Sequence, residues 1–249
     1  MTLHSLRAYR HVMLDMNGTF LFGFDNFGPA EDFGATYARL GYATLAPREA
    51  HARVRAAYDY MATRYEDPAY YADFPTVPEA LLRTGADGLP EGALPELADT
   101  FAHHELGHLP AAHRAAIAAL AAVRPLSVLS NLWAPPARWE AFLVECGLRQ
   151  NLQQVVYSCQ GREIKPHPGI FRRALASLGL TPDEVLYVGD SYRCDVAGAR
   201  GVGMDVVWLR GTRQPPAQPP EGVYAACDLV SWVAGLEVLP KGLSSRPDS

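Results

Sequence analysis

The feature that most constrains the fold is an alternation of helical patterns and short apolar runs in the second half of the chain. Helical periodicity begins near Ala112, and each helical stretch leads into a short run rich in Val and Leu. These runs predict strands at residues 126–129, 154–158, 185–188 and 205–209. Strands that alternate with helices at this spacing form βαβ units, so the pattern predicts a doubly wound α/β fold with a parallel sheet.

A further strand is predicted near the N-terminus, and a segment of different character follows it. A short apolar run ends at Asp15 and leads into the turn Asn17-Gly18. Prolines then punctuate helical patterns as far as residue 111, and no run in this segment is typical of a strand. We therefore predict an α/β core of residues 1–22 and 112–249, with a helical domain of residues 23–111 inserted after the first strand.

Composition and charge exclude several classes of protein. The chain has 249 residues, 49% hydrophobic and 20% charged, which is enough to form a core and excludes a disordered protein. A net charge of −5 argues against a nucleic-acid-binding protein, which needs a basic surface. The four cysteines are scattered without a CxxC pair, and no segment resembles a signal peptide or a membrane span. We expect a cytoplasmic protein that binds neither nucleic acid nor membrane.

Polar side chains stand at the ends of three predicted strands. Asp15, Ser130 and Asp190 lie at or just beyond strand ends, and Lys165 precedes a helix that opens at Pro166. Ligands of open parallel sheets bind at the carboxyl ends of the strands, so we expect these side chains to converge. Lys165 also stands out because only two of the 22 lysines and arginines are lysines.

This combination of charges predicts a site for a metal ion and a phosphate group. Asp15 and Asp190 repel one another unless a cation lies between them, and carboxylate oxygens suit Mg²⁺. Ser130, the amides of its loop and Lys165 supply hydrogen-bond donors for an anion. A phosphate group that bridges Mg²⁺ and these donors is the expected ligand.

Four motifs, in this order, resemble those of the haloacid dehalogenase-like superfamily. They are Asp15-Met16-Asn17-Gly18-Thr19, Ser130-Asn131, Lys165-Pro166, and Gly189-Asp190-Ser191 through Asp195. The predicted helical domain lies where that family places its type-1 cap. The resemblance implies an Mg²⁺-dependent phosphohydrolase that acts on a small phosphorylated metabolite.

The resemblance also implies a role for each residue around the phosphate. Asp15 is the nucleophile that forms an aspartyl-phosphate. Lys165 neutralises Asp15 and the phosphate. The catalytic residues that the resemblance implies are thus Asp15, Asn17 and Lys165. The phosphoryl group is bound by Thr19, Ser130, Asn131 and Lys165.

The implied metal ligands are Asp15, Asp190 and the backbone carbonyl of Asn17, with Asp195 orienting Lys165 or a metal-bound water. Asn17 departs from the phosphatases of the family, which carry an Asp here as general acid and base. An amide side chain cannot deliver a proton near neutral pH, and losing such help costs about 10²–10⁴-fold in rate. We therefore expect slow turnover, with activated aryl or acyl phosphates affected least.

The presence of Asn17 in place of an aspartate leaves three interpretations of the protein's function open. The chain is a slow or specialised phosphohydrolase with another proton donor, or it is a phospholigand-binding or regulatory relative with little turnover. In the third explanation, the Asn17-Gly18 dipeptide deamidates and yields an aspartate with time.

Two more distant alternatives are a metal-free haloacid dehalogenase and a zinc hydrolase. The dehalogenases carry a tyrosine at the position of Asn17 and lack the Gly-Asp pair. The stretch His104-Glu105-Leu106-Gly107-His108 matches the HExxH zinc motif. That motif requires a continuous helix, which Gly107 and Pro110 interrupt, so we expect a solvated linker helix instead.

Tyrosines cluster in the predicted helical domain. Tyr58 and Tyr65 fall on the apolar side of its longest helix, which predicts that they belong to the core. Tyr60, Tyr70 and Tyr71 are therefore the better candidates for contact with a substrate.

Overall fold

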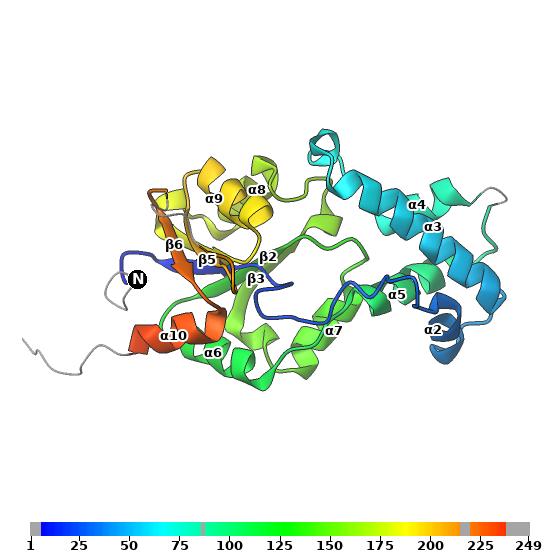
Figure 1. Cartoon of the computed structure of the whole chain (residues 1–249), viewed down its shortest axis with the longest axis horizontal. Helices are drawn as coiled ribbons and strands as arrows, with labels where there is room; N and C mark the ends of the chain where they lie inside the picture. The colour runs from blue at the N-terminus through cyan, green and yellow to red at the C-terminus, as the bar shows by residue number, and fades with distance from the viewer. Residues whose placement is uncertain (1–5, 86–87, 215–219, 238–249) are drawn as a thin grey trace, which may run out of the picture.

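The strands assemble into one parallel sheet in the order β3-β2-β1-β4-β5-β6 (Figure 1). A computed structural model describes residues 6–85, 88–214 and 220–237. Its strands are β1 (His11–Leu14), β2 (Leu126–Ser130), β3 (Leu152–Tyr157), β4 (Val185–Gly189), β5 (Asp205–Leu209) and β6 (Val223–Ala226). The strand order reverses direction at β1, which lies between β2 and β4, and such a switch point is where α/β sheets bind ligands. The predicted α/β fold class is confirmed.

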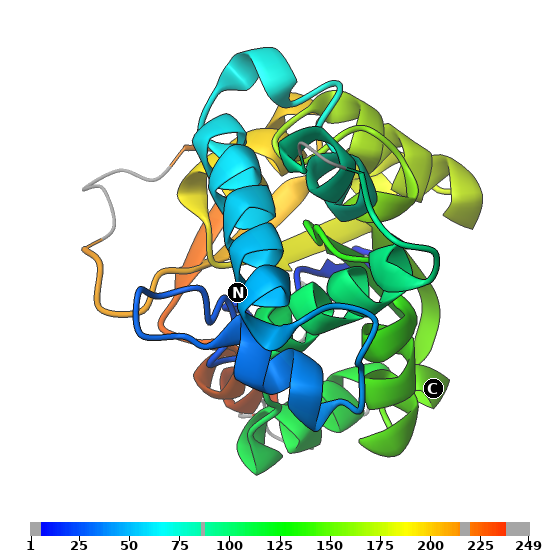
Figure 2. The ribbon, with the colours of Figure 1, turned by 90° about the vertical axis from the view of Figure 1, so that its right-hand side faces the viewer.

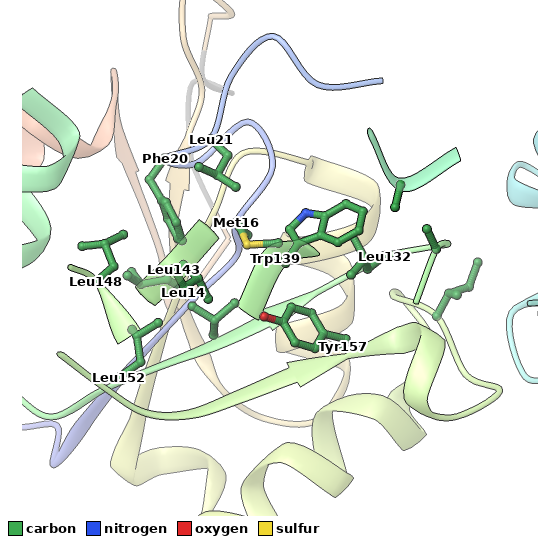
Figure 3. Close-up of a cluster of buried hydrophobic side chains, with 14 of the residues drawn as sticks. Leu14, Met16, Phe20, Leu21, Leu132, Trp139, Leu143, Leu148, Leu152 and Tyr157 are labelled. Carbon is green, nitrogen blue, oxygen red and sulfur yellow. The ribbon is translucent and has the colours of Figure 1, made fainter. Parts of the chain in front are cut away.

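Helices cover both faces of the sheet. One face packs on α6 (Ala111–Ala121), α7 (Ala137–Glu145) and α10 (Leu229–Glu237), and the other on α8 (Pro168–Leu178) and α9 (Ala197–Gly201). Successive residues of a strand point to opposite faces, so Leu14 of β1 belongs to one hydrophobic cluster and Met13 to the other. Figure 3 shows the first cluster, with Trp139 and Leu143 of α7 near Leu14.

Among the described residues, four α-helices lie between β1 and α6 in the chain and form what we call the helical insert. They are α2 (Phe33–Arg39), α3 (Pro47–Tyr65), α4 (Val77–Thr84) and α5 (Ala93–Glu105). They gather beyond one end of the sheet in Figure 1, and α3 crosses in front of the sheet in Figure 2. As expected, the described residues of this segment contain no strand. The boundaries predicted at 22/23 and 111/112 stay a prediction, and residues 1–5 and 238–249 lie outside the described ranges.

Most predicted elements agree with the observed ones to within two residues. The predicted strand at 205–209 coincides with β5, and the predicted strand at 185–188 is one residue shorter than β4. Sequence reasoning missed α2, whose residues include a glycine and a β-branched threonine and so have low helix propensity. Asp32 compensates by capping it, because its Oδ1 accepts a hydrogen bond from the N–H of Ala35 at 2.9 Å.

The remaining elements are short. The 3₁₀ turns are η1 (Pro68–Tyr70), η2 (Arg149–Asn151), η3 (Ser158–Gln160) and η4 (Pro182–Glu184), and η5 (Tyr192–Val196) is a π-helical turn. Within the described ranges, none of the helices combines the length and the apolar character that crossing a bilayer requires.

Candidate active site

The site is built around the ammonium group of Lys165, which lies between two buried carboxylates. Its Nζ donates hydrogen bonds to Asp15 Oδ1 at 2.6 Å and to Asp195 Oδ1 at 2.7 Å. Nζ also lies 3.1 Å from the hydroxyl oxygen of Tyr187 on β4. Burial alone lowers the pKa of Lys165, but the ion pairs outweigh burial and hold this pKa well above its usual value. Lys165 is therefore charged and fixed in position.

Three carboxylates lie close enough together to bind one cation. Oxygens of Asp15, Asp190 and Asp195 all lie within 4.8 Å of one another. Burial raises the pKa of Asp15 to about 7 and that of Asp190 to about 6, and neighbouring carboxylates add to both shifts. Lys165 does not offset all of this negative charge. The set of carboxylate oxygens therefore fits a hard divalent cation such as Mg²⁺.

Asp195 is held by hydrogen bonds to both of its carboxylate oxygens. Oδ1 accepts from Lys165, and Oδ2 accepts from the backbone N–H of Ser191 at 2.9 Å. The π-helical turn η5 begins directly after Ser191 and brings Asp195 back toward it. Because both oxygens are engaged, this geometry suits Asp195 to orient Lys165, and it leaves Asp15 and Asp190 as the better cation ligands.

Two glycines make room for the carboxylates. A Cβ atom on Gly18 would lie 2.7 Å from the carboxyl group of Asp190, and Gly18 has a positive φ of 81°. A Cβ atom on Gly189 would lie 2.5 Å from the carboxyl carbon of Asp195. Glycine is required at both positions because any side chain would displace a carboxylate of the site.

The loop after β2 fixes the backbone of Lys165. Asn131 Oδ1 accepts from the N–H of Lys165 at 2.8 Å, and its Nδ2 donates to the carbonyl of Lys165 at 3.1 Å. Nδ2 also donates to the hydroxyl of Tyr65 on α3 at 3.0 Å. Ser130, fully buried at the end of β2, lines the cavity beside Asn131. Asn131 thus connects the phosphate-binding loop predicted from the sequence to the helical insert.

A cavity of about 470 Å³ opens over these groups. Most of the residues predicted from the sequence line it together: Asp15, Asn17, Ser130, Asn131, Lys165, Asp190 and Asp195. Thr19 is not among the described lining residues, and its buried hydroxyl has no hydrogen-bond partner within the described part of the chain. The role predicted for Thr19 in phosphate binding stays a prediction without geometric support.

Asn17 stands at the cavity wall with an unused side-chain oxygen. Its Oδ1 is buried and has no hydrogen-bond partner among the described residues. The N–H of Gly18, which would have to attack the Asn17 side chain during deamidation, donates instead to the carbonyl of Leu21 at 2.8 Å. This hydrogen bond disfavours the explanation in which Asn17 deamidates.

The HExxH stretch does not form the solvated linker helix predicted from the sequence. His104 and Glu105 are both buried, and α5 ends at Glu105, so His108 lies beyond the helix. Both ring nitrogens of His104 already have partners, the carbonyl of Asn26 at 3.0 Å and the hydroxyl of Thr36 at 2.9 Å. The geometry gives no support to a zinc site at these residues.

Glu105 instead joins the helical insert to the loop after β2. Its Oε1 accepts from the N–H of Trp133 at 2.7 Å, and its Oε2 accepts from the N–H of Ala134 at 2.9 Å. Burial raises the pKa of Glu105 to about 8, although these hydrogen bonds oppose the shift. Sequence reasoning missed this role because an acidic residue near a helix end resembles an ordinary exposed one.

The tyrosines at the cavity are not those predicted. Tyr58 and Tyr65, which were expected in the core, line the cavity, whereas Tyr60, Tyr70 and Tyr71 do not. Helical periodicity identifies the inward face of α3, and that face meets the cavity as well as the core. Tyr187 was missed for a related reason: it lies within an apolar strand, and its sequence context gives no sign that its hydroxyl contacts Lys165.

Comparison with known proteins connects this geometry to a family. Residues 125–209 match the family model of haloacid dehalogenase-like hydrolases. A glyceraldehyde 3-phosphate phosphatase of Pyrococcus furiosus is 37% identical over 95 residues, which are 38% of this chain and 35% of that protein. A phosphoserine phosphatase of Thermus thermophilus is 41% identical over 80 residues, which are 31% of this chain and 32% of that protein. These matches support membership of the haloacid dehalogenase-like superfamily. The chain matches about a third of the length of each of these relatives.

Solved structures of the superfamily share the fold over nearly the whole chain. A phosphatase of this superfamily from Thermococcus onnurineus has a TM-score of 0.59 and 23% identity, with 92% of this chain and 98% of that chain covered. A 2-haloacid dehalogenase from Pseudomonas syringae pv. Tomato DC3000 has a TM-score of 0.63 and 18% identity, with the same coverage. At these identities the likeness establishes the fold and does not choose between the two activities.

Proposed function

We propose that this chain is an Mg²⁺-dependent phosphohydrolase that acts on phosphate monoesters of small metabolites, with Asp15 as the nucleophile. The observation that carries the proposal is the position of Lys165, between Asp15 and Asp195 and beside Asp190, in a cavity at the switch point of the sheet. The named activities of the two curated relatives, both phosphatases, support the same choice.

The proposed reaction begins with attack of Asp15 on phosphorus. Lys165 binds Oδ1 of Asp15, so Oδ2 is the oxygen available to form the new bond. The bond between phosphorus and the ester oxygen breaks, the leaving oxygen takes its proton from water and departs as the alcohol, and an aspartyl-phosphate remains. Water then attacks phosphorus, which releases phosphate and restores Asp15. Lys165 balances the negative charge in both steps.

Asp15, Asp190 and the backbone carbonyl of Asn17 would hold Mg²⁺. When bound, the ion supplies positive charge that draws electron density from the phosphoryl group. Ser130 and Asn131 line the same cavity and are proposed to bind phosphoryl oxygens. Asp195 is proposed to act through Lys165 as a positioning residue.

The helical insert is proposed to act as a cap over this site. Two backbone hydrogen bonds pair Phe22 with His108 where the chain leaves and re-enters the α/β core, at 3.0 and 2.8 Å. Glu105 and Tyr65 then connect the insert to the loop after β2. Such contacts would close the insert over the cavity and exclude water.

Asn17 favours a second candidate, a phospholigand-binding protein with little turnover. Asn17 lines the cavity, and its amide can donate a hydrogen bond to the leaving oxygen but cannot transfer a proton to it near neutral pH. Mg²⁺ and phosphate binding do not depend on that proton. The two candidates therefore differ in turnover and share the same ligand.

Hydrolysis of para-nitrophenyl phosphate in the presence of Mg²⁺ tests the proposal, because this leaving group needs little protonation. We expect slow hydrolysis that Asp15→Asn abolishes, while Asp183→Asn, at the exposed turn η4 before β4, retains it. Calorimetric titration with inorganic phosphate and Mg²⁺ measures binding separately. Binding without hydrolysis would establish the second candidate, and hydrolysis that survives Asp15→Asn would contradict the first.

A further inference from the structure

We call the lining residues other than the polar residues around Lys165 the outer cavity, and more of its side chains are acidic than basic. Its acidic side chains are Asp25, Glu66 and Glu105, and its cationic side chain is Arg193. Arg193 is already engaged, because Nη2 lies 3.0 Å from Glu66 Oε1 and Nη1 donates to the hydroxyl of Tyr71. Among the described lining residues, no cation is left for a second anionic group on a substrate.

Of the negative charges in this region, that of Asp25 is the one least balanced by a nearby cation. It lies in the loop between β1 and α2 with a left-handed backbone, φ 61°, and it is one of the residues that line the cavity. The residue is exposed, but desolvation by the surrounding protein still raises the pKa of its carboxyl group, as expected for a carboxylate without a paired cation. Its neighbour Glu105 has a pKa of about 8 and is largely protonated at neutral pH. A ligand in the outer cavity therefore meets the charge of Asp25.

Aromatic rings form the apolar wall of the same region. They belong to Phe24, Tyr58, Tyr65 and Trp133. The ring centroid of Trp133 lies 5.8 Å from that of Tyr58 and 5.3 Å from that of Tyr65. Trp133 also packs against Phe101 of α5, which fixes the wall. The faces of aromatic rings attract cations, most strongly where water is excluded. Arg193 already lies over the Tyr65 ring at 5.3 Å and Arg55 over the Tyr58 ring at 5.7 Å, whereas no cation of the described residues lies over the rings of Phe24 and Trp133.

We propose that this outer cavity binds an alkylated ammonium group, so that the preferred substrates are phosphate monoesters of amino alcohols with an alkylated nitrogen. The phosphate lies at Lys165, and the ammonium group lies between Asp25 and the aromatic wall. Substrates with a second anionic group are disfavoured because that group would face Asp25, and no unpaired cation among the described lining residues would offset the repulsion. This inference rests on the phosphohydrolase function proposed for the same site.

Two esters of the same shape and different charge test the inference. They are choline phosphate and 3,3-dimethylbutyl phosphate, in which a carbon atom replaces the charged nitrogen. Because the charged nitrogen also makes choline a better leaving group, the two esters are compared by affinity, as competitive inhibitors of para-nitrophenyl phosphate hydrolysis with Mg²⁺. We expect Ki for choline phosphate to be lower than that for the neutral ester by about tenfold or more, and equal Ki values for the two esters would overturn the inference.

The variant Asp25→Asn tests whether Asp25 causes this preference for the charged ester. Asparagine tolerates the left-handed backbone at position 25, so the variant removes the charge without straining the loop. We expect the ratio of the two Ki values, neutral ester to choline phosphate, to fall several-fold in Asp25→Asn and to stay unchanged in Asp183→Asn. A ratio that Asp25→Asn leaves intact would refute the subsite.

Failure of the proposed phosphohydrolase function can be distinguished from failure of the ammonium subsite. If no Asp15-dependent hydrolysis of para-nitrophenyl phosphate is found, the phosphohydrolase proposal fails, and calorimetric titration of the same two esters with Mg²⁺ then measures the preference directly. Tighter binding of choline phosphate that depends on Asp25 supports the ammonium subsite. Equal affinity for the two esters overturns it.

Discussion

Replacing Asn17 by aspartate should accelerate the hydrolysis of alkyl phosphates. The side chains have the same shape, and Oδ1 of Asn17 is buried at the cavity wall without a hydrogen-bond partner among the described residues, so the variant should keep the fold. The new carboxyl group would lie in the buried, acidic surroundings that raise the pKa of Asp15 to about 7, which favours its protonated form. The carboxyl group introduced at position 17 could then donate a proton to the leaving alcohol.

The size of the effect follows from the leaving group. General acid catalysis contributes about 10²–10⁴-fold, so we expect a gain of at least about 10²-fold for an alkyl phosphate, or about 2.7 kcal/mol of the barrier. The gain for para-nitrophenyl phosphate should be less than about tenfold because its leaving group needs little protonation. Initial rates with Mg²⁺ at mildly acidic pH measure both values.

Asn151→Asp is the matched control, because it adds the same charge in η2, outside the described lining of the cavity. It should change neither rate. No gain with the alkyl ester in a folded Asn17→Asp protein would refute the reasoning and would mean that another group already supplies the proton.

Three further predictions concern buried ionisable groups. Lys165→Met leaves Asp15 and Asp195 buried without their cation, so urea unfolding at neutral pH should show a loss of about 3–5 kcal/mol, and an unchanged midpoint would contradict the ion-pair account. Burial lowers the pKa of His11 to about 4, so the unfolded chain binds a proton that the folded protein does not. Its stability should therefore fall by roughly 2–3 kcal/mol as the pH drops from about 6.5 to 4, and His11→Leu should lack this fall. For Glu105 the dependence of stability on pH has the opposite sign. Its carboxyl group stays protonated in the folded protein up to about pH 8, so stability should decline as the pH rises toward that value. Glu105→Gln should flatten this decline, and an identical slope in both proteins would count against the assignment.

The α/β core could be predicted because its signal is local. Each strand is a short apolar run between turn residues, and Asp15, Ser130 and Asp190 stand at or directly after the ends of such runs. The parallel arrangement brings these three strand ends together, whereas Lys165 lies eight residues after β3 and Asp195 lies in η5. Gly18 and Gly189 are explained only by the structure, which shows that their missing side chains make space for Asp190 and Asp195.

The outer cavity could not be predicted because its contacts join distant segments. Asn131 meets Tyr65, and Glu105 meets the amides after β2, across 66 and 28 positions of the chain. Helical periodicity assigned Tyr58 and Tyr65 to a core face, but it could not show that this face also borders a cavity. The roles of His104 and Glu105 could not be predicted from the HExxH motif for the same reason. Burial and contacts with distant segments of the chain determine what these two residues do.

The central claim is that Asp15 receives the phosphoryl group, and acid quenching during turnover tests it most directly. With para-nitrophenyl phosphate and Mg²⁺, the account predicts that mass spectrometry finds one phosphoryl group on the peptide that contains Asp15. Asn17 should slow the second step and so favour accumulation of this intermediate, and hydroxylamine should remove the label. A phosphoryl group on a different residue, or continued turnover in Asp15→Asn, would contradict the account.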